Sequence, residues 1–169
     1  TLLVVFDGSG SFWGQLEGER RSKLAAARES VRDGLARVGR DTRIGVMSYG
    51  HRRAGDCSDV EVAVRPETGA GDRVMAFLDK INPRGRGPIT NALREASRHI
   101  GPGNGAASVL LIHDDPDNCQ LDPCDALADL REAHPRVVVH VVSVGMPREA
   151  AQRMQCLTKG TGGRHYEVS

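Results

Sequence analysis

The sequence predicts an α/β protein of three layers, in which a doubly wound, mostly parallel six-stranded sheet is covered by helices on both faces. Short apolar runs alternate with amphipathic stretches along the whole chain, as in folds that alternate strands and helices. The first run, residues 2–6, is apolar throughout, which is typical of a central strand buried on both faces. Two later extended segments, 43–49 and 60–64, are separated by only about ten residues, too few for a helical crossover. They predict one antiparallel strand at an edge of the sheet.

The other elements follow from the spacing of apolar residues and from turn residues. Apolar positions three or four residues apart predict a long helix over 17–38 and two shorter helices around 74–81 and 93–100. The second of these is stopped by the Gly- and Pro-rich segment 101–105. The rest of the chain alternates regularly, with predicted strands at 108–113, 136–144 and 164–168 and predicted helices at 122–133 and 147–159.

Length and charge narrow the classes of protein. The 169 residues are enough for one domain, and we expect a single domain over 1–169. The 23 basic and 22 acidic residues nearly cancel, so the charge gives no reason to expect a nucleic-acid partner. No apolar run approaches the ~20 residues that span a bilayer, so we expect membrane association only through a parent protein. The chain opens directly on a strand, as an excised domain would.

Four cysteines carry information about compartment. An even number of cysteines predicts two disulfides and an oxidising, periplasmic or extracellular environment. Free thiols and a structural zinc site are the alternatives, and zinc is disfavoured because no Cys-x-x-Cys pair is present. The cysteines are Cys57, Cys119, Cys124 and Cys156.

The turn after the first strand carries the clearest chemistry. It reads Asp7-Gly8-Ser9-Gly10-Ser11, which places a carboxylate and two hydroxyls at alternate positions between glycines that permit a tight turn. In open α/β sheets ligands bind at the carboxyl ends of the strands. Oxygen ligands suit a hard cation such as Mg²⁺, Mn²⁺ or Ca²⁺. The alternative is that these residue types are simply common in turns and helix caps.

Three enzymatic interpretations of the same loop are weaker. A dinucleotide-binding loop would need an acidic residue at the end of the next strand, where Tyr49-Gly50-His51 stands. A phosphatase-type aspartate nucleophile would need an acid two residues after Asp7, where Ser9 stands. A serine nucleophile elbow needs glycines two residues before and after the serine, and neither serine has both. A metal-dependent hydrolase is therefore only a remote alternative.

The Asp7-Gly-Ser-Gly-Ser11 loop after a buried strand resembles the Asp-x-Ser-x-Ser signature of von Willebrand factor A (VWA) domains. The resemblance covers essentially the whole chain, including Thr161-Gly-Gly-Arg-His-Tyr166 at the junction between the last predicted helix and the last predicted strand. It is closest to bacterial cysteine-containing members, through two segments: Tyr49-Gly-His-Arg-Arg-x-Gly-Asp-Cys57 and Cys119-x-x-Asp-Pro-Cys124.

The resemblance implies a doubly wound fold with strand order 3-2-1-4-5-6 and a metal-ion-dependent adhesion site. Asp7, Ser9 and Ser11 match the first motif of that site, and Asp114 matches the aspartate after the fourth strand. Two positions depart from the pattern. Gly87 stands before Pro88 where the family usually has a ligating Thr, so that Thr90 is the nearest substitute hydroxyl, and Asp115 replaces the family's glycine.

The resemblance also implies a rim for partner binding. It places five residues of two loops at the same rim as Asp7; the five are His51, Arg52, Arg53, Arg84 and Arg86. Trp13 directly follows the Asp7–Ser11 loop in the sequence. Arginines are usually simply solvated, but they are also suited to bidentate capture of a partner's acidic side chain. Trp13 is interpreted either as packed under a loop or as an exposed binding anchor.

Two more expectations concern His113 and the disulfides. His113 is expected to diverge from Asp114, because neighbouring residues of a strand face opposite sides, and to be a core residue rather than a general base. The strand order implied by the resemblance separates Cys57 from Cys156 by the width of the sheet, too far for a disulfide, so that Cys57 pairs with Cys119 or Cys124 and Cys156 with the other. The helix adjacency implied by the same fold favours Cys57–Cys119 with Cys124–Cys156.

Together these observations predict a non-enzymatic protein-binding, adhesion or scaffolding module. A divalent cation would help it to capture a partner's carboxylate. The alternative is a structural VWA domain with a vestigial metal site inside a larger envelope or secreted protein.

Overall fold

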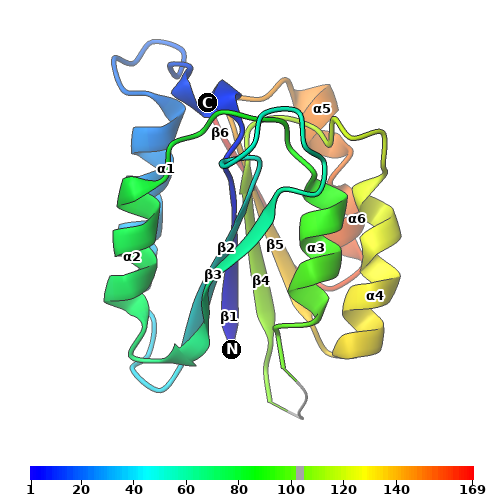
Figure 1. Ribbon diagram of the computed structural model, residues 1–169. Coiled ribbons are helices and arrows are strands. Elements are labelled where there is room, and N and C mark those ends of the chain that lie inside the picture. Colours follow the sequence, from blue (N-terminus) through cyan, green and yellow to red (C-terminus); the bar gives the residue numbers. More distant parts are fainter. Residues whose placement is uncertain (102–104) are drawn as a thin grey trace.

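A computed structural model describes residues 1–101 and 105–169 and contains a six-stranded sheet with the order β3-β2-β1-β4-β5-β6 (Figure 1). All neighbouring strands are parallel except the pair β2 and β3, which is antiparallel at one edge. The predicted fold class and strand order are therefore confirmed. The strands are β1 (Leu2–Asp7), β2 (Arg43–Tyr49), β3 (Val60–Thr68), β4 (Ser108–His113), β5 (Val138–Val144) and β6 (His165–Val168).

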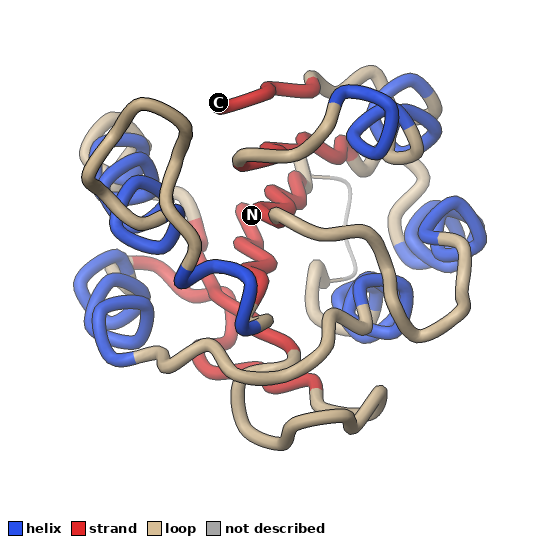
Figure 2. The backbone as a smooth tube through the Cα atoms, turned by 90° about the horizontal axis from the view of Figure 1, so that it is seen from above, coloured by secondary structure: helices blue, strands red, loops and turns tan. Residues whose placement is uncertain are grey.

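Helices cover both faces of the sheet, which the view from above shows as two groups on opposite sides of the strands (Figure 2). One group is α1 (Lys23–Leu35) and α2 (Gly71–Lys80), which pack against each other. The other group contains α3 (Ile89–Ser97), α4 (Ala126–Ala133) and α6 (Gln155–Lys159). The shorter helical elements are the 3-10 turns η1 (Gly10–Trp13) and η2 (Pro123–Asp125) and the helix α5 (Arg148–Gln152).

The alternation of side chains along β1 divides the core in two. Leu3 and Val5 pack on the face covered by α3, α4 and α6, whereas Val4 and Phe6 pack on the face covered by α1 and α2. All four side chains are fully buried. Burial on both faces explains why this strand lacks the polar alternation of a half-exposed strand. It also fixes the end of β1, and so the loop after Asp7, in the middle of the sheet.

Several predicted bounds were wrong. The long helix begins at Lys23 rather than at residue 17, because residues 15–22 form a turn with Gly18 at a φ of 73° and a bridge from Gln15 to Ser22. Ser22 then caps the helix by accepting the N–H of Ala25. The strand predicted at 60–64 extends to Thr68 because its partner β2 continues alongside it.

Later elements also differ from the predictions. The helix predicted at 147–159 is two short helices, α5 and α6, and the helix predicted from 122 begins as the 3-10 turn η2. The strand predicted from 136 begins at Val138, and the helix predicted to reach residue 100 ends at Ser97. The stop predicted at 101–105 falls partly on residues 102–104, which lie outside the described residues.

Two disulfides join Cys57 to Cys119 and Cys124 to Cys156, which is the pairing that the resemblance favours. All four cysteines are bonded, so neither free thiols nor a zinc–thiolate site remains. Within residues 1–101 and 105–169, no helix has the length and apolar character needed to cross a membrane.

Candidate metal centre

The site residues come together at the carboxyl edge of the sheet. β1 and β4 are parallel neighbours, so the loop that follows Asp7 and the turn that follows His113 meet at the same edge. Asp7, Ser9 and Asp114 are buried there. The two parallel strands thus bring together residues that are more than one hundred positions apart in the sequence.

Short hydrogen bonds hold this cluster together. The backbone N–H of Ser9 donates to Oδ1 of Asp7 at 2.7 Å, and the Ser11 hydroxyl donates to Oδ1 of Asp114 at 2.7 Å. The hydroxyls of Ser9 and Ser11 lie 2.9 Å apart. The N–H of Asp114 reaches Oδ2 of Asp7 at 3.4 Å. Two carboxylates and two hydroxyls therefore converge, an oxygen-rich set that suits a hard cation.

Charge in the cluster is only partly balanced. Burial, followed by the nearby charge of Asp114, raises the pKa of Asp7 to about 8. Lys23 compensates on one side, with its Nζ 3.1 Å from Oδ2 of Asp114. Burial and then Asp114 also raise the pKa of Asp115. A cation would relieve the repulsion between two acids held close together.

Three loops around the cluster are joined by backbone hydrogen bonds. The N–H of Gly8 donates to the carbonyl of Tyr49 at 2.8 Å, and the N–H of Arg84 donates to the carbonyl of Gly8 at 3.0 Å. The N–H of Gly85 donates to the carbonyl of Gly50 at 2.7 Å. The loops after β1 and β2 and the loop before α3 therefore form one connected surface.

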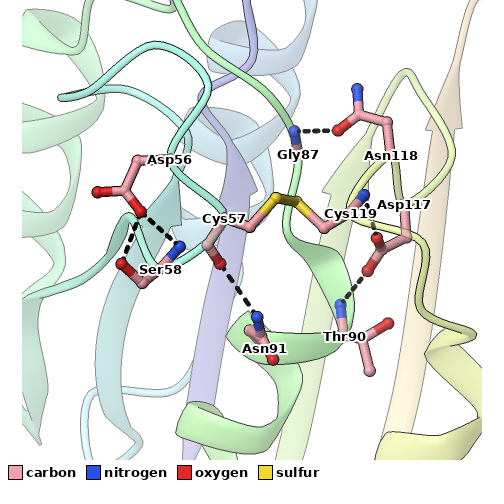
Figure 3. The surroundings of a disulfide bond; sticks show 9 residues. All are labelled: Asp56, Cys57, Ser58, Gly87, Thr90, Asn91, Asp117, Asn118 and Cys119. Atoms are coloured by element: carbon pink, nitrogen blue, oxygen red, sulfur yellow. Dashed lines mark hydrogen bonds between the residues drawn. A yellow bond between two sulfur atoms is a disulfide. The ribbon is translucent and has the colours of Figure 1, made fainter.

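The Cys57–Cys119 disulfide connects the β2–β3 loop to the segment after β4, close to the start of α3 (Figure 3). The amide Oδ1 of Asn118 accepts the N–H of Gly87 at 2.8 Å, and Oδ2 of Asp117 accepts the N–H of Thr90 at 2.8 Å. The residues next to the disulfide thus cap the first turn of α3 from another part of the chain.

Gly87, at the position of the missing threonine, and Thr90, the nearest substitute hydroxyl, lie differently relative to the cluster. A side chain at Gly87 would point into the cluster, since a Cβ there would lie 4.0 Å from Oδ1 of Asp7 and 3.3 Å from Cε2 of Tyr49. Thr90 is buried, and no hydrogen bond joins its hydroxyl to Asp7, Ser9, Ser11 or Asp114 among the described residues. Thr90 as a ligand remains a prediction.

The residues present fit a cation better than they fit a closed hydrogen-bond network. The hydroxyls of Tyr49 and Thr90 are buried and have no hydrogen-bond partner among the residues that the structure describes. Burial, and then the charges of Asp7, Asp114 and Asp117, raise the pKa of the Tyr49 phenol well above its usual range. The candidate ligands are two serine hydroxyls and two aspartate carboxylates, so the set contains fewer than three His, Cys, Asp or Glu residues. Accordingly, the part of the chain that the structure describes has no group of three or more His, Cys, Asp or Glu that could hold a metal.

The predicted rim residues fall into two groups. Trp13 is 53% exposed, and its indole N–H donates to the carbonyl of Pro83 at 2.8 Å, which ties η1 to the loop carrying Arg84 and Arg86. Both of these arginines are exposed, and no ion pair involves them within residues 1–101 and 105–169. Arg52 and Arg53, by contrast, pair with acids of their own loop and of the start of β3.

Those pairs lie within the β2–β3 loop and between this loop and the start of β3. Arg52 bonds Oδ1 of the buried Asp59 at 2.8 Å and Oε2 of Glu61 at 3.2 Å, and Arg53 pairs with Asp56 at 3.1 Å. His51 is buried, and desolvation lowers its pKa although Glu61 opposes the shift. The arginines of this half of the rim are therefore paired, whereas Arg84 and Arg86, in the other half, have no ion-pair partner within the described part of the chain.

His113 points away from the cluster. Its Nε2 lies 2.7 Å from the hydroxyl of Ser143 and its Nδ1 lies 3.0 Å from the carbonyl of Asp115. Burial lowers the pKa of His113 to about 4. This neutral, buried imidazole is a core residue, and its neighbour Asp114 belongs to the site.

Sequence reasoning missed Lys23 and the two capping residues Asp117 and Asn118. Lys23 falls inside a stretch predicted as helix, where a lysine gives no local sign of pairing with an aspartate 91 residues away. Asp117 and Asn118 lie beside Cys119. Their position next to a cysteine predicted to form a disulfide was the signal in the sequence that could have identified them.

No protein-family model matches the sequence. The chain is 26% identical over 177 residues to the uncharacterized protein YwmD of Bacillus subtilis (strain 168), with 99% of this chain and 78% of that protein covered. Among solved structures, the SpRpn10 VWA domain superposes with a TM-score of 0.72 at 9% identity over 99% of this chain and 86% of that one.

Two larger proteins contain a similar domain. Proximal thread matrix protein 1 (PTMP1) from the mussel byssus, in a structure with a zinc-occupied MIDAS motif, has a TM-score of 0.72 at 17% identity. The pilus adhesin SpaC from Lactobacillus rhamnosus GG has a TM-score of 0.74 at 11% identity. Each match covers 99% of this chain, but only 41% of PTMP1 and 27% of SpaC. The chain therefore has the von Willebrand factor A fold.

Proposed function

We propose that the chain is a non-enzymatic protein-binding module of the adhesion or scaffold type, which binds its partner at the carboxyl edge of the sheet. The observation that carries the proposal is the convergence of oxygen atoms from Asp7, Ser9, Ser11 and Asp114 at that edge. These residues would hold a divalent cation, Mg²⁺, Mn²⁺ or Ca²⁺. When bound, the cation supplies a positive charge to which a carboxylate oxygen of the partner can coordinate.

The rim supports capture of an acidic side chain. Arg84 and Arg86 are exposed and carry no internal ion pair in the described chain, so their guanidinium groups are available to a carboxylate. Trp13 presents a half-exposed ring that is held in place by its bond to Pro83. Tryptophan is enriched among the residues that anchor protein interfaces.

The comparisons support the class of function. SpaC is described as a pilus adhesin, PTMP1 as a thread matrix protein, and one PTMP1 structure has zinc in the corresponding motif. The two disulfides support a periplasmic or extracellular location. We expect any membrane association to come from a parent protein.

An enzymatic function has little support from the site. The serine–histidine contacts of the described residues both involve the hydroxyl of Ser143, which lies 2.7 Å from His113 and 2.8 Å from His165. Ser143 is buried, so its hydroxyl is poorly placed to attack a substrate. A structural domain with a vestigial metal site is the second candidate. Gly87 favours it, because this position carries no hydroxyl.

Calorimetric titration with Mg²⁺, Mn²⁺ and Ca²⁺ tests the metal site. We expect the wild-type protein to bind at least one of these ions, and Asp7→Ala to lose binding while keeping the wild-type circular dichroism spectrum. No binding of any of the three ions would favour the structural alternative.

Peptide capture tests the binding function. The probe is an immobilised panel of peptides that contain Asp or Glu, presented with and without the metal. We expect the double variant Arg84→Glu/Arg86→Glu to lose capture. The control Arg37→Glu/Arg40→Glu makes the same charge change on exposed arginines between α1 and β2, at the opposite edge of the sheet, and should retain capture. Equal capture by both double variants would contradict the proposed rim.

A further inference from the structure

Lys23 is the cation that the fold itself supplies to the acidic cluster. Its Nζ lies 3.1 Å from Oδ2 of Asp114, and the exposed fractions of the two side chains are 16% and 0%. Among the residues that the structure describes, no other basic side chain forms an ion pair with Asp7 or Asp114. The pair is thus largely removed from solvent screening.

The lysine lies in a slot shaped by glycine. A Cβ on Gly145 would lie only 2.7 Å from Cε of Lys23, so any side chain there would displace the lysine stem. A Cβ on Gly14 would lie 3.7 Å from the same carbon, and the carbonyl of Gly14 accepts the N–H of Lys23 at 2.7 Å. The first residue of α1 is therefore held at both its backbone and its stem, which limits the freedom of the ammonium group.

Lys23 and Ser11 share a single carboxylate. The Ser11 hydroxyl donates to Oδ1 of Asp114, and the lysine ammonium donates to Oδ2. A cation held by the two serines would therefore lie close to the lysine charge and would compete with it for Asp114. Like charges a few ångströms apart in a partly buried site repel strongly.

We propose that Lys23 is the resident cation of this site, which lowers its affinity for divalent metals and stabilises the cluster when no metal is bound. This inference rests on the proposed function in so far as it assigns a metal site to Asp7, Ser9, Ser11 and Asp114. It makes Lys23 a positioning residue that determines the affinity of the site for divalent metals. A merely structural ion pair would contribute to stability without changing metal affinity.

Lys23→Met is the direct test, because methionine keeps an unbranched stem in the glycine slot and removes the charge. We expect it to bind Mg²⁺ and Mn²⁺ at least about tenfold more tightly than the wild type in calorimetric titrations. In EDTA its melting temperature should fall, and Mg²⁺ should raise it more than in the wild type. The control Lys159→Met removes a charge from an exposed lysine at the end of α6 and should match the wild type in both measurements. Equal metal affinities of Lys23→Met and the wild type would overturn the proposal, as would absence of metal binding in both.

A measurement on the unmodified protein keeps the test decisive if Lys23→Met does not fold. The chain has three lysines, Lys23, Lys80 and Lys159, so their side-chain NMR signals can be separated. Titration with Mg²⁺ should shift the Lys23 signal and leave the other two in place. A Lys23 signal that stays fixed up to the highest soluble Mg²⁺ concentration would overturn the proposal.

Failure of this inference is distinguishable from failure of the proposed function. Tighter metal binding by Lys23→Met with no capture of acidic peptides would support the resident cation and contradict the binding function. Metal-dependent peptide capture with unchanged affinity in Lys23→Met would support the binding function and overturn the resident cation.

Discussion

Cys57 and Cys119 are joined by a disulfide, with their Cα atoms 5.8 Å apart, between the β2–β3 loop and the segment that caps α3. The bond places Asp117 and Asn118 where they accept the N–H groups of Thr90 and Gly87. The second disulfide, Cys124–Cys156, joins η2 to α6 and includes none of these contacts. The two bonds therefore have different consequences for the site, although each closes a loop of the chain.

Replacing each disulfide by serines should separate these roles. We expect Cys57→Ser/Cys119→Ser and Cys124→Ser/Cys156→Ser each to lower the free energy of unfolding by roughly 2–5 kcal/mol in urea titrations. Only the first pair should increase hydrogen exchange at the N–H groups of Gly87 and Thr90. Equal exchange at these amides in both double variants would show that the Cys57–Cys119 bond does not fix the start of α3.

Gly50 marks the closest approach between two of the site loops. Its φ is +71°, and a Cβ there would lie 1.8 Å from the carbonyl oxygen of Arg86. Gly69 has nearly the same conformation, with a φ of +77°, but nothing lies within 4 Å of its would-be Cβ. Alanine at either position therefore meets the same backbone strain, and only at Gly50 does it also collide with another loop.

Gly69→Ala should lower the free energy of unfolding by about 1–2 kcal/mol, the cost of a left-handed conformation in a residue with a Cβ. Gly50→Ala should cost more than that, because the loop carrying Arg86 has to move away. Urea unfolding of the two variants measures the difference. If both lose the same stability, the contact between these loops is not tight in solution.

Burial of a neutral imidazole at His113 should make stability depend on pH. Burial lowers the pKa of His113 to about 4, below its value of about 6.5 in the unfolded chain, so the unfolded state binds more protons between these values. The contribution is complete above pH 6.5 and is lost as the pH falls towards 4. The ring contacts Ser143 and the carbonyl of Asp115, and the nearby titratable groups are His165, which lowers the pKa of His113, and Asp114, which raises it.

We expect this residue to remove about 2 kcal/mol of stability between pH 7.5 and pH 5. His113→Gln keeps an amide able to hydrogen bond but has no imidazole to protonate, so its stability should fall less over the same interval. Urea unfolding at the two pH values gives the comparison. An identical pH dependence in His113→Gln and the wild type would assign the loss to other groups.

The fold could be predicted from local patterns, but the details of the site could not. The apolar run of β1 and the Asp7–Ser11 loop are continuous in the sequence. Together they carry the resemblance that implies the strand order, and they indicate where ligands are expected. Lys23 and Asn118 reach the site only after α1 and the segment after β4 have packed across the sheet edge. Their contacts depend on tertiary distances, on which the spacing of residues within one segment gives no information.

The same limit applied to the rim and the helix ends. Arg52, Arg53, Arg84 and Arg86 are alike as residues in loops, and only the positions of Asp59 and Asp56 show that the first two are neutralised. The helix over 147–159 has a continuous helical pattern but breaks near Arg153. Nothing in the structure explains that break.

Gly87 offers a gain-of-function test of the site. A Cβ at this position would lie 4.0 Å from Oδ1 of Asp7, so a hydroxyl one bond further could reach the cluster. Its contact with Cε2 of Tyr49, at 3.3 Å, is tight, and any side chain at this position incurs the same cost. Gly87→Ser adds the oxygen and Gly87→Ala adds only the carbon, so the two variants differ by the hydroxyl alone.

We expect Gly87→Ser to bind Mg²⁺ roughly tenfold more tightly than Gly87→Ala in calorimetric titrations, because the serine adds a hard oxygen ligand. Equal affinities of the two variants would mean that a side chain at position 87 does not reach the cation, and that the missing threonine is not what limits metal binding in this chain.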